Sequence, residues 1–577
     1  MAFVNNFSAA GGNTALLLKD APSRKPTGHD PRPVHVIASS AKSWYSLKNN
    51  IDALIGYLDR QTSQSDIDEL DLLASLAYTT TARRTHHSLR ITATCSSLQE
   101  LRGSLQKSVL TEAYASVPTT PPKIGFVFTG QGCQYVGMGR HLYEDCARFR
   151  SQILRYDCIS RNQGFPSIIP LVSGSAESID ALSPLVVQLG TTCLQVALVN
   201  YWKSLGVEPA FVIGHSLGDF AALCAAGVLS VSDTILLCGR RCQLLLEYCE
   251  IGTHSMLAVK ASLSRVKQLL SDDAEIDIAC LNGPEETVVS GLRPTISEIA
   301  QKCSLEGVKS TELKLPYAFH SAQVLPILEE LKTAASKVSF QKPSVPFVSC
   351  LLGEVITDVN ADTLCADYMV RQCRETVNFL AGLEAARHAG FANDETIWVE
   401  IGSHTICSGL IKSTVGPHVT TVASMRRGEN DWKTLSHSMS DLHLLGISLN
   451  WIEFHQDFKQ SHRVLPLPAY KWELKDFWIP YRNNFCLNKG APGGTSEPVP
   501  QVPFLTAAAQ QIIEDRSQGA EATVVVQNDI AYPELNRVIQ GHKVNGAALC
   551  PSVGYPICSS KMQDARTNLI CSHSTPI

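Results

Sequence analysis

Two apolar segments that run directly into glycine-rich turns constrain the fold of this 577-residue chain more than any other feature. The segment KIGFVFTGQG begins at Lys123, and PAFVIGHSLG begins at Pro209. Their hydrophobicity is continuous rather than alternating, which indicates strands covered on both faces. Residues 184–206, PLVVQLGTTCLQVALVNYWKSLG, are typical of a long buried helix. The order strand, helix, strand therefore predicts an α/β core around a parallel sheet.

A second pattern interrupts this core between about residues 255 and 316. Its segments are MLAVK, SRVKQLLSD, IDIACLN, TVVSG, RPTISEIAQKC and KSTELKL. Read as strand, helix, strand, strand, helix, strand, they have the β-α-β-β-α-β order of a ferredoxin-like fold. The core pattern resumes with PFVSC and ETIWVEIG. An inserted subdomain creates a cleft against the sheet it interrupts, and clefts hold substrates.

Two breaks rich in proline and glycine, residues 20–33 and 488–503, enclose most of the chain. Just after the first break, residues 34–117 combine strand-like and helical segments without a cluster of reactive side chains. We expect this small α+β unit to be a connector.

Composition argues against several classes of function. The net charge is −5 without a basic stripe, so we expect no nucleic-acid partner. No uninterrupted apolar run approaches the roughly 20 residues of a membrane span, and MAFVNNFSAAGG lacks the features of a signal peptide. We therefore expect a cytoplasmic protein without a membrane segment. The 19 cysteines are scattered without paired CxxC units, which predicts reduced thiols and no metal site.

Ser216 lies in GHSLG, between an apolar strand and a helix of small residues. Gly214 and Gly218 permit the tight turn that exposes a nucleophilic serine, and the helix amino terminus favours developing negative charge. The alternative is a chance GxSxG in an ordinary turn. A nucleophile in this setting serves enzymes that pass an acyl group to water and enzymes that pass it to a thiol.

A serine nucleophile needs a base, and His320 in LPYAFHSAQV is the best placed of the 17 histidines, just beyond the inserted unit. His215 adjoins the serine but points elsewhere on the turn. Arg240 and Arg241 follow on the next apolar helix, and the sequence leaves open which of them faces the cleft. A buried arginine there would hold a carboxylate through paired hydrogen bonds.

Six features occur together in this chain: FTGQGCQYVGMG, GHSLGDF, Arg241, CLNGPEETVVSG, YAFHS and EIGSHTICSGLI. In order and spacing they resemble the malonyl-CoA:acyl-carrier-protein acyltransferase family, which implies such a domain over residues 118–440. The resemblance implies an α/β fold whose parallel-sheet core is α/β-hydrolase-like and carries the ferredoxin-like insert.

The same resemblance assigns roles to single residues. It makes Ser216 the nucleophile and His320 the base, and it places the oxyanion-hole N–H groups at Gln131 and Leu217. Arg241 would bind the free carboxylate of the malonyl group. A main-chain carbonyl at about Asn378 would orient the histidine.

The pocket lining that the resemblance implies consists of His215, Asn282, Tyr317 and Phe319. In this family Phe319 favours malonyl over methylmalonyl by crowding the substituent on C2, although Tyr317 is commoner in the methylmalonyl class. For Asn282, the alternative is an ordinary turn residue. Malonyl-CoA is then a substrate, with no bound cofactor, and the acceptor is a phosphopantetheine thiol on an acyl carrier protein supplied in trans.

The flanking segments also resemble parts of fungal non-reducing polyketide synthases. Residues 1–33 resemble the carboxy-terminal edge of a ketosynthase, and residues 34–117 the linker that joins a ketosynthase to an acyltransferase. Residues 441–487, with LPLPAYKWELKDFWIPY, resemble the segment that wraps back after the acyltransferase, and residues 488–503 read as a flexible linker.

Residues 504–577 resemble the start of a product-template hotdog domain. LNRVIQGHKVNGAALCP matches the HxxxGxxxxP motif of that domain, with His542, Gly546 and Pro551 at the motif positions. The second hotdog half, which would supply the aspartate partner, does not follow in the sequence, so His542 is interpreted as vestigial.

The segment that resembles a ketosynthase lacks the active-site cysteine and histidines, and no carrier-protein serine motif occurs. We therefore expect a fragment whose one complete domain is the acyltransferase, working with a carrier protein, a ketosynthase and other synthase domains. Two alternatives stay open: a non-functional or docking fragment, and an α/β-hydrolase esterase with an Asp or Glu between the serine and the histidine in chain order.

Overall fold

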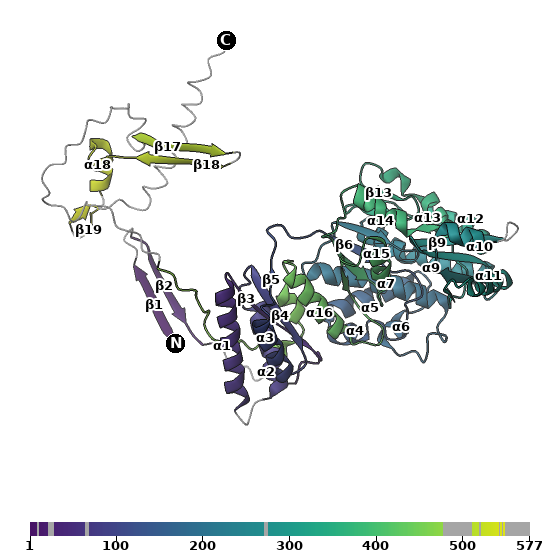
Figure 1. Ribbon diagram of the computed structural model, residues 1–577, viewed down its shortest axis with the longest axis horizontal. Helices are drawn as coiled ribbons and strands as arrows, with labels where there is room; N and C mark the ends of the chain where they lie inside the picture. Colours follow the sequence, from purple (N-terminus) through teal and green to yellow (C-terminus); the bar gives the residue numbers. More distant parts are fainter. Residues whose placement is uncertain are drawn as a thin grey trace, which may run out of the picture. The chain divides into compact units, whose positions relative to one another are not determined.

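The computed structural model describes residues 1–7, 11–20, 28–63, 68–270, 275–476, 510–518, 521–541, 543–544 and 546–548. The chain divides into two compact units, residues 1–475 and residues 476–577. The first unit contains a large mixed α/β core, an inserted small sheet and an α+β linker unit (Figure 1).

A six-stranded sheet in the order β13-β12-β7-β6-β15-β16 forms the centre of the core. Its strands are Ile124–Phe128 (β6), Phe211–Gly214 (β7), Phe347–Ser349 (β12), Glu354–Ile356 (β13), Ile397–Ile401 (β15) and Thr420–Ala423 (β16). All neighbouring strands are parallel except β12 and β13, which are antiparallel. The predicted parallel α/β core is therefore confirmed, and the edge strands β13 and β16 are additions to the prediction.

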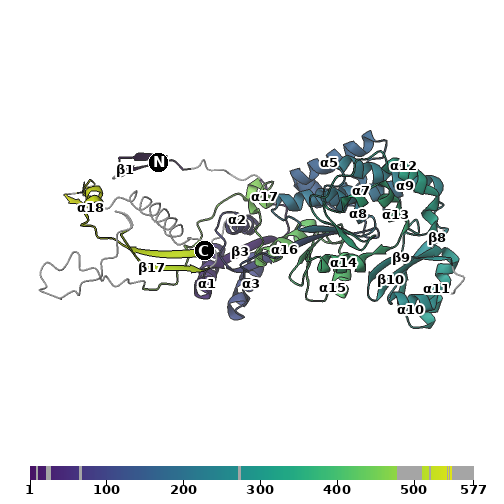
Figure 2. The ribbon, with the colours of Figure 1, turned by 90° about the horizontal axis from the view of Figure 1, so that it is seen from above.

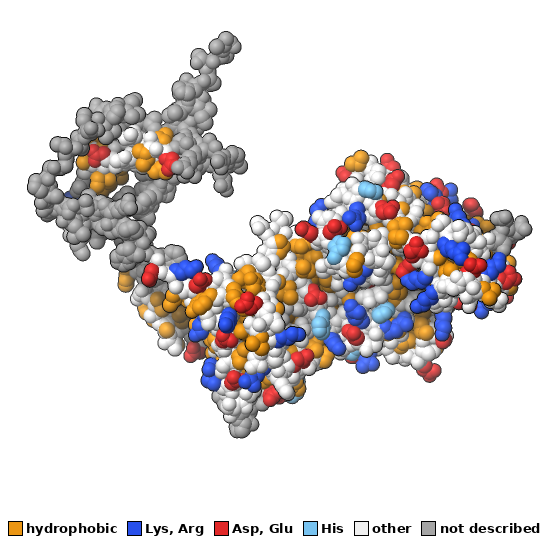
Figure 3. Space-filling model, viewed as in Figure 1, with side chains coloured by type: hydrophobic (Ala, Val, Ile, Leu, Met, Phe, Trp, Pro, Cys, Tyr) orange, Lys and Arg blue, Asp and Glu red, His pale blue; other side chains and the backbone are white. Residues whose placement is uncertain are grey.

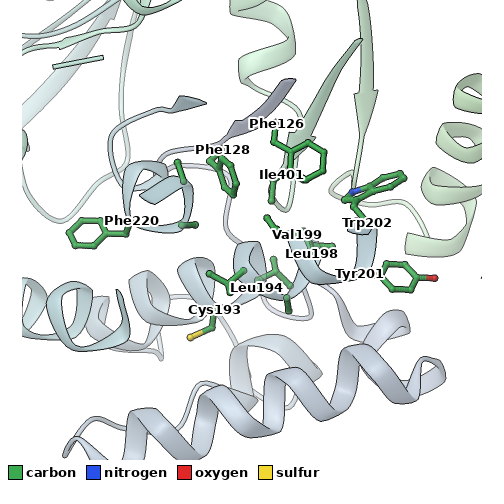
Figure 4. Close-up of a cluster of buried hydrophobic side chains, with 14 of the residues drawn as sticks. Phe126, Phe128, Cys193, Leu194, Leu198, Val199, Tyr201, Trp202, Phe220 and Ile401 are labelled. Atoms are coloured by element: carbon green, nitrogen blue, oxygen red, sulfur yellow. The ribbon is translucent and has the colours of Figure 1, made fainter. Parts of the chain in front are cut away.

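Helices cover both faces of this sheet, as the continuous hydrophobicity of β6 and β7 requires. Phe126 and Phe128 pack into one cluster with helix α7 (Pro184–Ser204), as Figure 4 shows, whereas Val127 packs into a second cluster on the opposite face. Among the described helices, α7 has the length and apolarity of a membrane span, and 89% of its most apolar window is buried inside the fold.

The other helices around the core are short or amphipathic. They are Arg140–Asp145 (α4), Ala147–Asn162 (α5), Ile169–Ser173 (α6), Gly218–Ala225 (α8), Val231–Tyr248 (α9), Leu328–Ala335 (α12), Ala366–Arg374 (α13), Phe379–His388 (α14), Cys407–Thr414 (α15), Asp431–Leu444 (α16) and Trp451–His455 (α17), with 3-10 turns at Ala322–Ile327, Ala361–Thr363 and Lys459–Ser461. Acidic and basic side chains are interspersed over the face of the molecule shown in Figure 3.

The insert forms a five-stranded sheet in the order β11-β8-β10-β9-β14. Its elements are His254–Val259 (β8), Leu263–Leu269 (α10), Ile276–Gly283 (β9), Glu286–Leu292 (β10), Arg293–Leu305 (α11) and Ser310–Glu312 (β11). Strands β8 to β11 are antiparallel neighbours in the predicted ferredoxin-like order. The sequence pattern missed Val377–Asn378 (β14), which returns from the core and pairs in parallel with β9.

The linker unit is a three-stranded antiparallel sheet with three helices. It consists of His35–Ala41 (β3), Trp44–Thr62 (α1), Glu69–Ala82 (α2), Leu89–Cys95 (β4), Leu98–Leu110 (α3) and Ala115–Ser116 (β5). Ser43, Asp68 and Ser97 cap the three helices at their amino ends, which explains where each helix begins. Helix α16 packs on β3 and β4 and so joins this unit to the core (Figure 2).

The remaining elements are small. Residues Ala2–Phe7 (β1) and Asn13–Leu18 (β2) form an antiparallel hairpin whose side chains are all exposed. The second unit contains Gln511–Gln518 (β17), Glu521–Gln527 (β18), Pro533–Gln540 (α18), Lys543–Val544 (β19) and Ala547–Ala548 (β20). His542 and Pro551 lie outside the described residues.

Buried histidines gather where the linker unit meets α16 and α17. His455 lies 3.1 Å from a guanidinium nitrogen of Arg32, which is itself paired with buried Asp30. Burial, followed by the charge of Arg32, lowers the pKa of His35 to about 4. Burial also lowers the pKa of His443 to about 2 and that of His455 well below its usual range. These imidazoles are therefore neutral in the folded protein at neutral pH.

We predict that this joint is sensitive to acid. A histidine whose folded pKa is depressed contributes stability above its unfolded pKa, about 6.5, and loses it as the pH falls. Each such histidine lowers the free energy of unfolding by about 1.4 kcal/mol per pH unit below pH 6. In urea titrations at pH 6.5 and 5.0, His443→Phe should lose less stability between the two pH values than the wild type. Equal losses would contradict the assignment.

Candidate active site

Ser216 occupies the sharp turn between β7 and α8, with a left-handed φ of +53°. The flanking glycines are needed because other atoms of the protein lie where a side chain at either position would begin. A Cβ on Gly214 would lie 2.4 Å from the carboxylate of Asp219, and one on Gly218 would lie 2.4 Å from the carbonyl oxygen of Phe128. The strand-turn-helix context therefore produces the exposed-serine turn that the sequence predicts.

His320 lies against the serine, as the sequence predicts. The Oγ of Ser216 and the Nε2 of His320 are 2.7 Å apart. On the other side of the ring, Nδ1 is 3.0 Å from the main-chain carbonyl oxygen of Glu375. A carbonyl only accepts, so Nδ1 carries the proton and Nε2 presents its lone pair to the serine hydroxyl.

The environment of His320 keeps its ring neutral. The side chain is buried, and burial followed by the charge of Arg241 and the proximity of His215 lowers its pKa to about 3. A neutral imidazole is the form that accepts a proton from a nucleophile. The described site can therefore activate a hydroxyl without an acidic third member.

The prediction that the carbonyl at about Asn378 orients His320 is wrong, because the carbonyl of Glu375 accepts the hydrogen bond from the ring. Asn378 lies in β14, where its N–H donates to the carbonyl of Cys350 and its side chain accepts from the N–H of Ala381 at the start of α14. The main chain of Asn378 thus belongs to strand β14, and its side chain caps the amino end of α14. Glu375 follows the last residue of α13, where the chain leaves the helix and its carbonyl is free to face the imidazole.

Arg241 is the buried member of the arginine pair. It is 2% exposed, and its guanidinium donates to the side-chain oxygen of Gln188 at 2.6 Å. The guanidinium carbon lies 4.9 Å from the ring centre of Phe220 and 5.7 Å from that of Phe319. Since Phe220 follows the serine turn and Phe319 precedes His320, the charge lies between the two catalytic segments. Arg240 instead lies 3.9 Å from Glu330 nearer the surface.

Gln188 is a site residue that the motifs did not indicate. Within the described part of the chain, its amide nitrogen and the Nε of Arg241 are both buried without a hydrogen-bond partner. Unpaired buried donors are costly, so two in one pair point to an acceptor group as ligand. The sequence signal that could have indicated this residue is that polar Gln188 interrupts the apolar run of α7.

The positions expected to form an oxyanion hole adjoin the serine. Leu217 stands at the amino end of α8, where the first N–H groups of a helix lack acceptors within it. Gln131 follows Gly130, and a Cβ on Gly130 would lie 2.9 Å from the carbonyl oxygen of His215 and 3.4 Å from the Cβ of Ser216. The glycine-rich turn after β6 is therefore packed directly against the serine turn.

The other expected pocket residues fall into two groups. His215 and Asn282 pair with each other, with the ring Nε2 2.7 Å from the Asn282 side-chain oxygen, and burial lowers the pKa of His215. Because the Nε2 of His215 donates to this amide oxygen, it has no lone pair to offer the Ser216 hydroxyl. Tyr317 and Phe319 are both buried, with ring centres 6.0 Å apart. The hydroxyl of Tyr317 has no partner among the described residues.

Residues 125–449 match the acyl transferase domain family. The chain belongs to this family of acyltransferases. The non-reducing polyketide synthase albA of Aspergillus brasiliensis is 61% identical over 98% of this chain, and the conidial pigment polyketide synthase alb1 of Aspergillus fumigatus is 60% identical over 97%. The chain spans 26% of the length of each relative. It is thus an acyltransferase domain of the fungal non-reducing polyketide synthase type.

Solved acyltransferase structures share the fold. The acyltransferase domain of ZmaA superposes with a TM-score of 0.65 at 25% identity, covering 76% of this chain and 100% of that domain. The acyltransferase domain from module 8 of the salinomycin polyketide synthase gives 0.63 at 25% identity, covering 73% and 98%. These likenesses confirm the expected acyltransferase fold.

We predict that Gly218→Ala disrupts the acyltransferase site. The new methyl group would meet the carbonyl oxygen of Phe128, which belongs to the central sheet and cannot move aside. Urea unfolding should show a loss of about 1–3 kcal/mol. Gly409→Ala is the matched control, because a Cβ there has no neighbour within 4 Å. Equal stability of the two variants would contradict the close packing of Gly218 against the carbonyl oxygen of Phe128.

Proposed function

We propose that this acyltransferase moves a malonyl group from malonyl-CoA, through an ester on Ser216, to the phosphopantetheine thiol of an acyl carrier protein. The observation that carries the proposal is a buried arginine beside a hydrogen-bonded Ser216–His320 pair. The pair supplies the transfer chemistry, and the arginine selects an acyl group that ends in a carboxylate.

In the first step, the Oγ of Ser216 bonds to the thioester carbonyl carbon while the Nε2 of His320 takes the hydroxyl proton. The N–H groups of Leu217 and Gln131 stabilise the resulting oxyanion. The carbon–sulfur bond then breaks, and the CoA sulfur leaves with the proton from His320. In the second step, the carrier thiol gives its proton to His320 and its sulfur bonds to the ester carbonyl carbon. The bond from that carbon to the Oγ of Ser216 then breaks, and His320 returns the proton to the serine oxygen.

Arg241 links substrate choice to this chemistry. Its charge is one of the causes that depress the pKa of His320. A bound malonyl carboxylate offsets that charge, and so makes His320 a better proton acceptor when the correct acyl group is present. The unpaired donors of Arg241 and Gln188 also gain partners. An acetyl group supplies neither effect.

The surroundings of His320 favour a transferase over an esterase. The esterase alternative places an acidic side chain on the base, whereas Nδ1 of this histidine donates to a main-chain carbonyl. Transfer to a thiol also needs a site with few ordered waters. The aromatic rings of Phe220 and Phe319 around the guanidinium supply apolar walls, and the bulk of Phe319 favours malonyl over methylmalonyl.

The resemblance of the flanks extends the proposal to partners. Residues 1–33 and 34–117 are proposed to connect to a ketosynthase, and residues 504–577 to be part of a product-template region. The carrier protein would then be a neighbouring domain or a separate chain. Cytoplasmic location fits enzymes that consume CoA thioesters.

The direct test is transfer of label from radioactive malonyl-CoA to a purified carrier protein. We expect labelled enzyme without carrier and labelled carrier with it, whereas release of free malonate alone would indicate an esterase. Ser216→Ala should lower acyl-enzyme formation at least about 1,000-fold because no other group forms the ester. A wild-type protein with a cooperative thermal melt but no label would favour the docking-fragment alternative.

A second prediction concerns the choice of acyl group. Arg241→Ala should lower kcat/KM for malonyl-CoA at least about 100-fold while slow loading from acetyl-CoA is spared. Arg240→Ala, at the neighbouring surface position, is the control and should keep the preference for malonyl. Competition between the two CoA thioesters, with the acyl-enzymes resolved by mass, measures the ratio. Equal losses for both substrates would contradict a carboxylate clamp.

A further inference from the structure

We propose that Gln372 on helix α13 is a positioning residue for the nucleophile turn, beside the carbonyl of Glu375 that already orients His320. The inference rests on the proposed function only for the identity of the substrate. It concerns the support behind the nucleophile turn, which neither the motifs nor the mechanism above assigns.

Three groups on one side of α13 and its carboxy-terminal end reach the site. Tyr368 and Gln372 are spaced i and i+4 and so share one face of α13, and Glu375 follows the last residue of this helix. The amide nitrogen of Gln372 donates to the main-chain carbonyl of Ser216 at 2.8 Å. The carbonyl of Glu375 accepts from His320 at 3.0 Å. Helix α13 and the residue that follows it thus contact both the nucleophile and the base on the sides that face away from the reacting atoms.

The third contact reaches the helix that begins at the nucleophile. The Tyr368 hydroxyl donates to the carboxyl of Asp219 at 3.3 Å, in the first turn of α8. Asp219 is buried, and burial raises its pKa to about 8, so this carboxyl is neutral at pH 7. The contact therefore joins two neutral groups and places no charge behind the serine.

Both catalytic residues need such support, because each has an unfavourable backbone conformation. Ser216 has φ +53° and His320 has φ +58°, and Glu112 is the only other described non-glycine residue with positive φ. Left-handed backbone at such residues persists only where the surroundings hold it. The carbonyl of Ser216 accepts hydrogen bonds from Gln372 and from the N–H of Asp219, which hold the nucleophile turn. The bond from His320 to Glu375 orients the ring.

Helix α13 is suited to this task because it is itself firmly held. The Tyr368 hydroxyl lies 3.0 Å from the Ser349 hydroxyl, and its ring packs edge-on against Phe347, both in strand β12. Met369 and Cys373 are buried on the same helix. Gln372 is 3% exposed, and its oxygen has no partner among the described residues. Its amide nitrogen donates to the carbonyl of Ser216, and the side chain also makes a hydrogen bond with the carboxyl of Asp219, which follows the nucleophile turn.

The test replaces Gln372 with methionine, which keeps the length of the side chain and removes the donor. Asp367→Asn is the matched control, since Asp367 lies on the exposed side of the same helix and pairs with Lys332. The first readout is the rate at which an alkyl fluorophosphonate labels Ser216. There the Oγ–phosphorus bond forms, fluoride leaves and the hydroxyl proton passes to His320. This rate reports the alignment of the pair and needs no malonyl substrate.

We expect Gln372→Met to label about 10 to 100 times more slowly than wild type, because small misplacements of reacting groups cost about that much. The control should label at the wild-type rate. With malonyl-CoA, kcat should fall by a similar factor while KM changes less than about twofold, since binding groups are untouched. Because a fraction of unfolded protein would also lower kcat without changing KM, kcat is calculated per enzyme molecule that the fluorophosphonate finally labels.

Gln372→Leu, which also removes the amide donor but has a shorter apolar side chain, is the second variant should methionine prevent folding, as judged by thermal melts. Wild-type labelling by the folded variant overturns the inference. Failure of malonyl-CoA to acylate a wild-type enzyme that reacts normally with the fluorophosphonate would instead overturn the proposed substrate, and the comparison of labelling rates would still decide the role of Gln372.

Discussion

The hydrogen bond between Ser216 and His320 joins parts of the fold that are distant in sequence. The serine follows the second strand of the core sheet, and the histidine lies in the segment that returns from the inserted sheet. Their 2.7 Å separation therefore depends on how core and insert pack together. Strand β14 strengthens this packing, because it leaves α13 and pairs with β9 of the insert.

The buried charge of Arg241 imposes the second constraint. A guanidinium that is 2% exposed and has an unpaired nitrogen is tolerable only if the site regularly contains an acceptor. Burial, followed by the charge of Arg241 and the proximity of His215, lowers the pKa of His320 to about 3. A ligand carboxylate would satisfy the arginine and improve the base in one event. Specificity and catalysis would then share one electrostatic cause.

The sequence predicted the features that local patterns encode. Continuous apolar strands indicated the parallel core, the order of six segments indicated the insert, and the glycines around Ser216 indicated the turn. Local patterns left Arg240 and Arg241 undecided, and the family resemblance singled out Arg241. The resemblance placed the carbonyl at about Asn378 rather than at Glu375, because its position depends on how α13 lies against the core. Gln188 and Gln372 were missed for the same reason, since a buried glutamine acquires its role only from tertiary partners.

A crystal structure of the enzyme after reaction with malonyl-CoA, with deacylation slowed by cold, tests the central claim most directly. We predict an ester on Ser216 whose carboxylate accepts hydrogen bonds from Arg241 and whose carbonyl oxygen faces the N–H groups of Leu217 and Gln131. An ester on another residue, or a carboxylate directed to solvent with Arg241 still unpaired, would contradict the account.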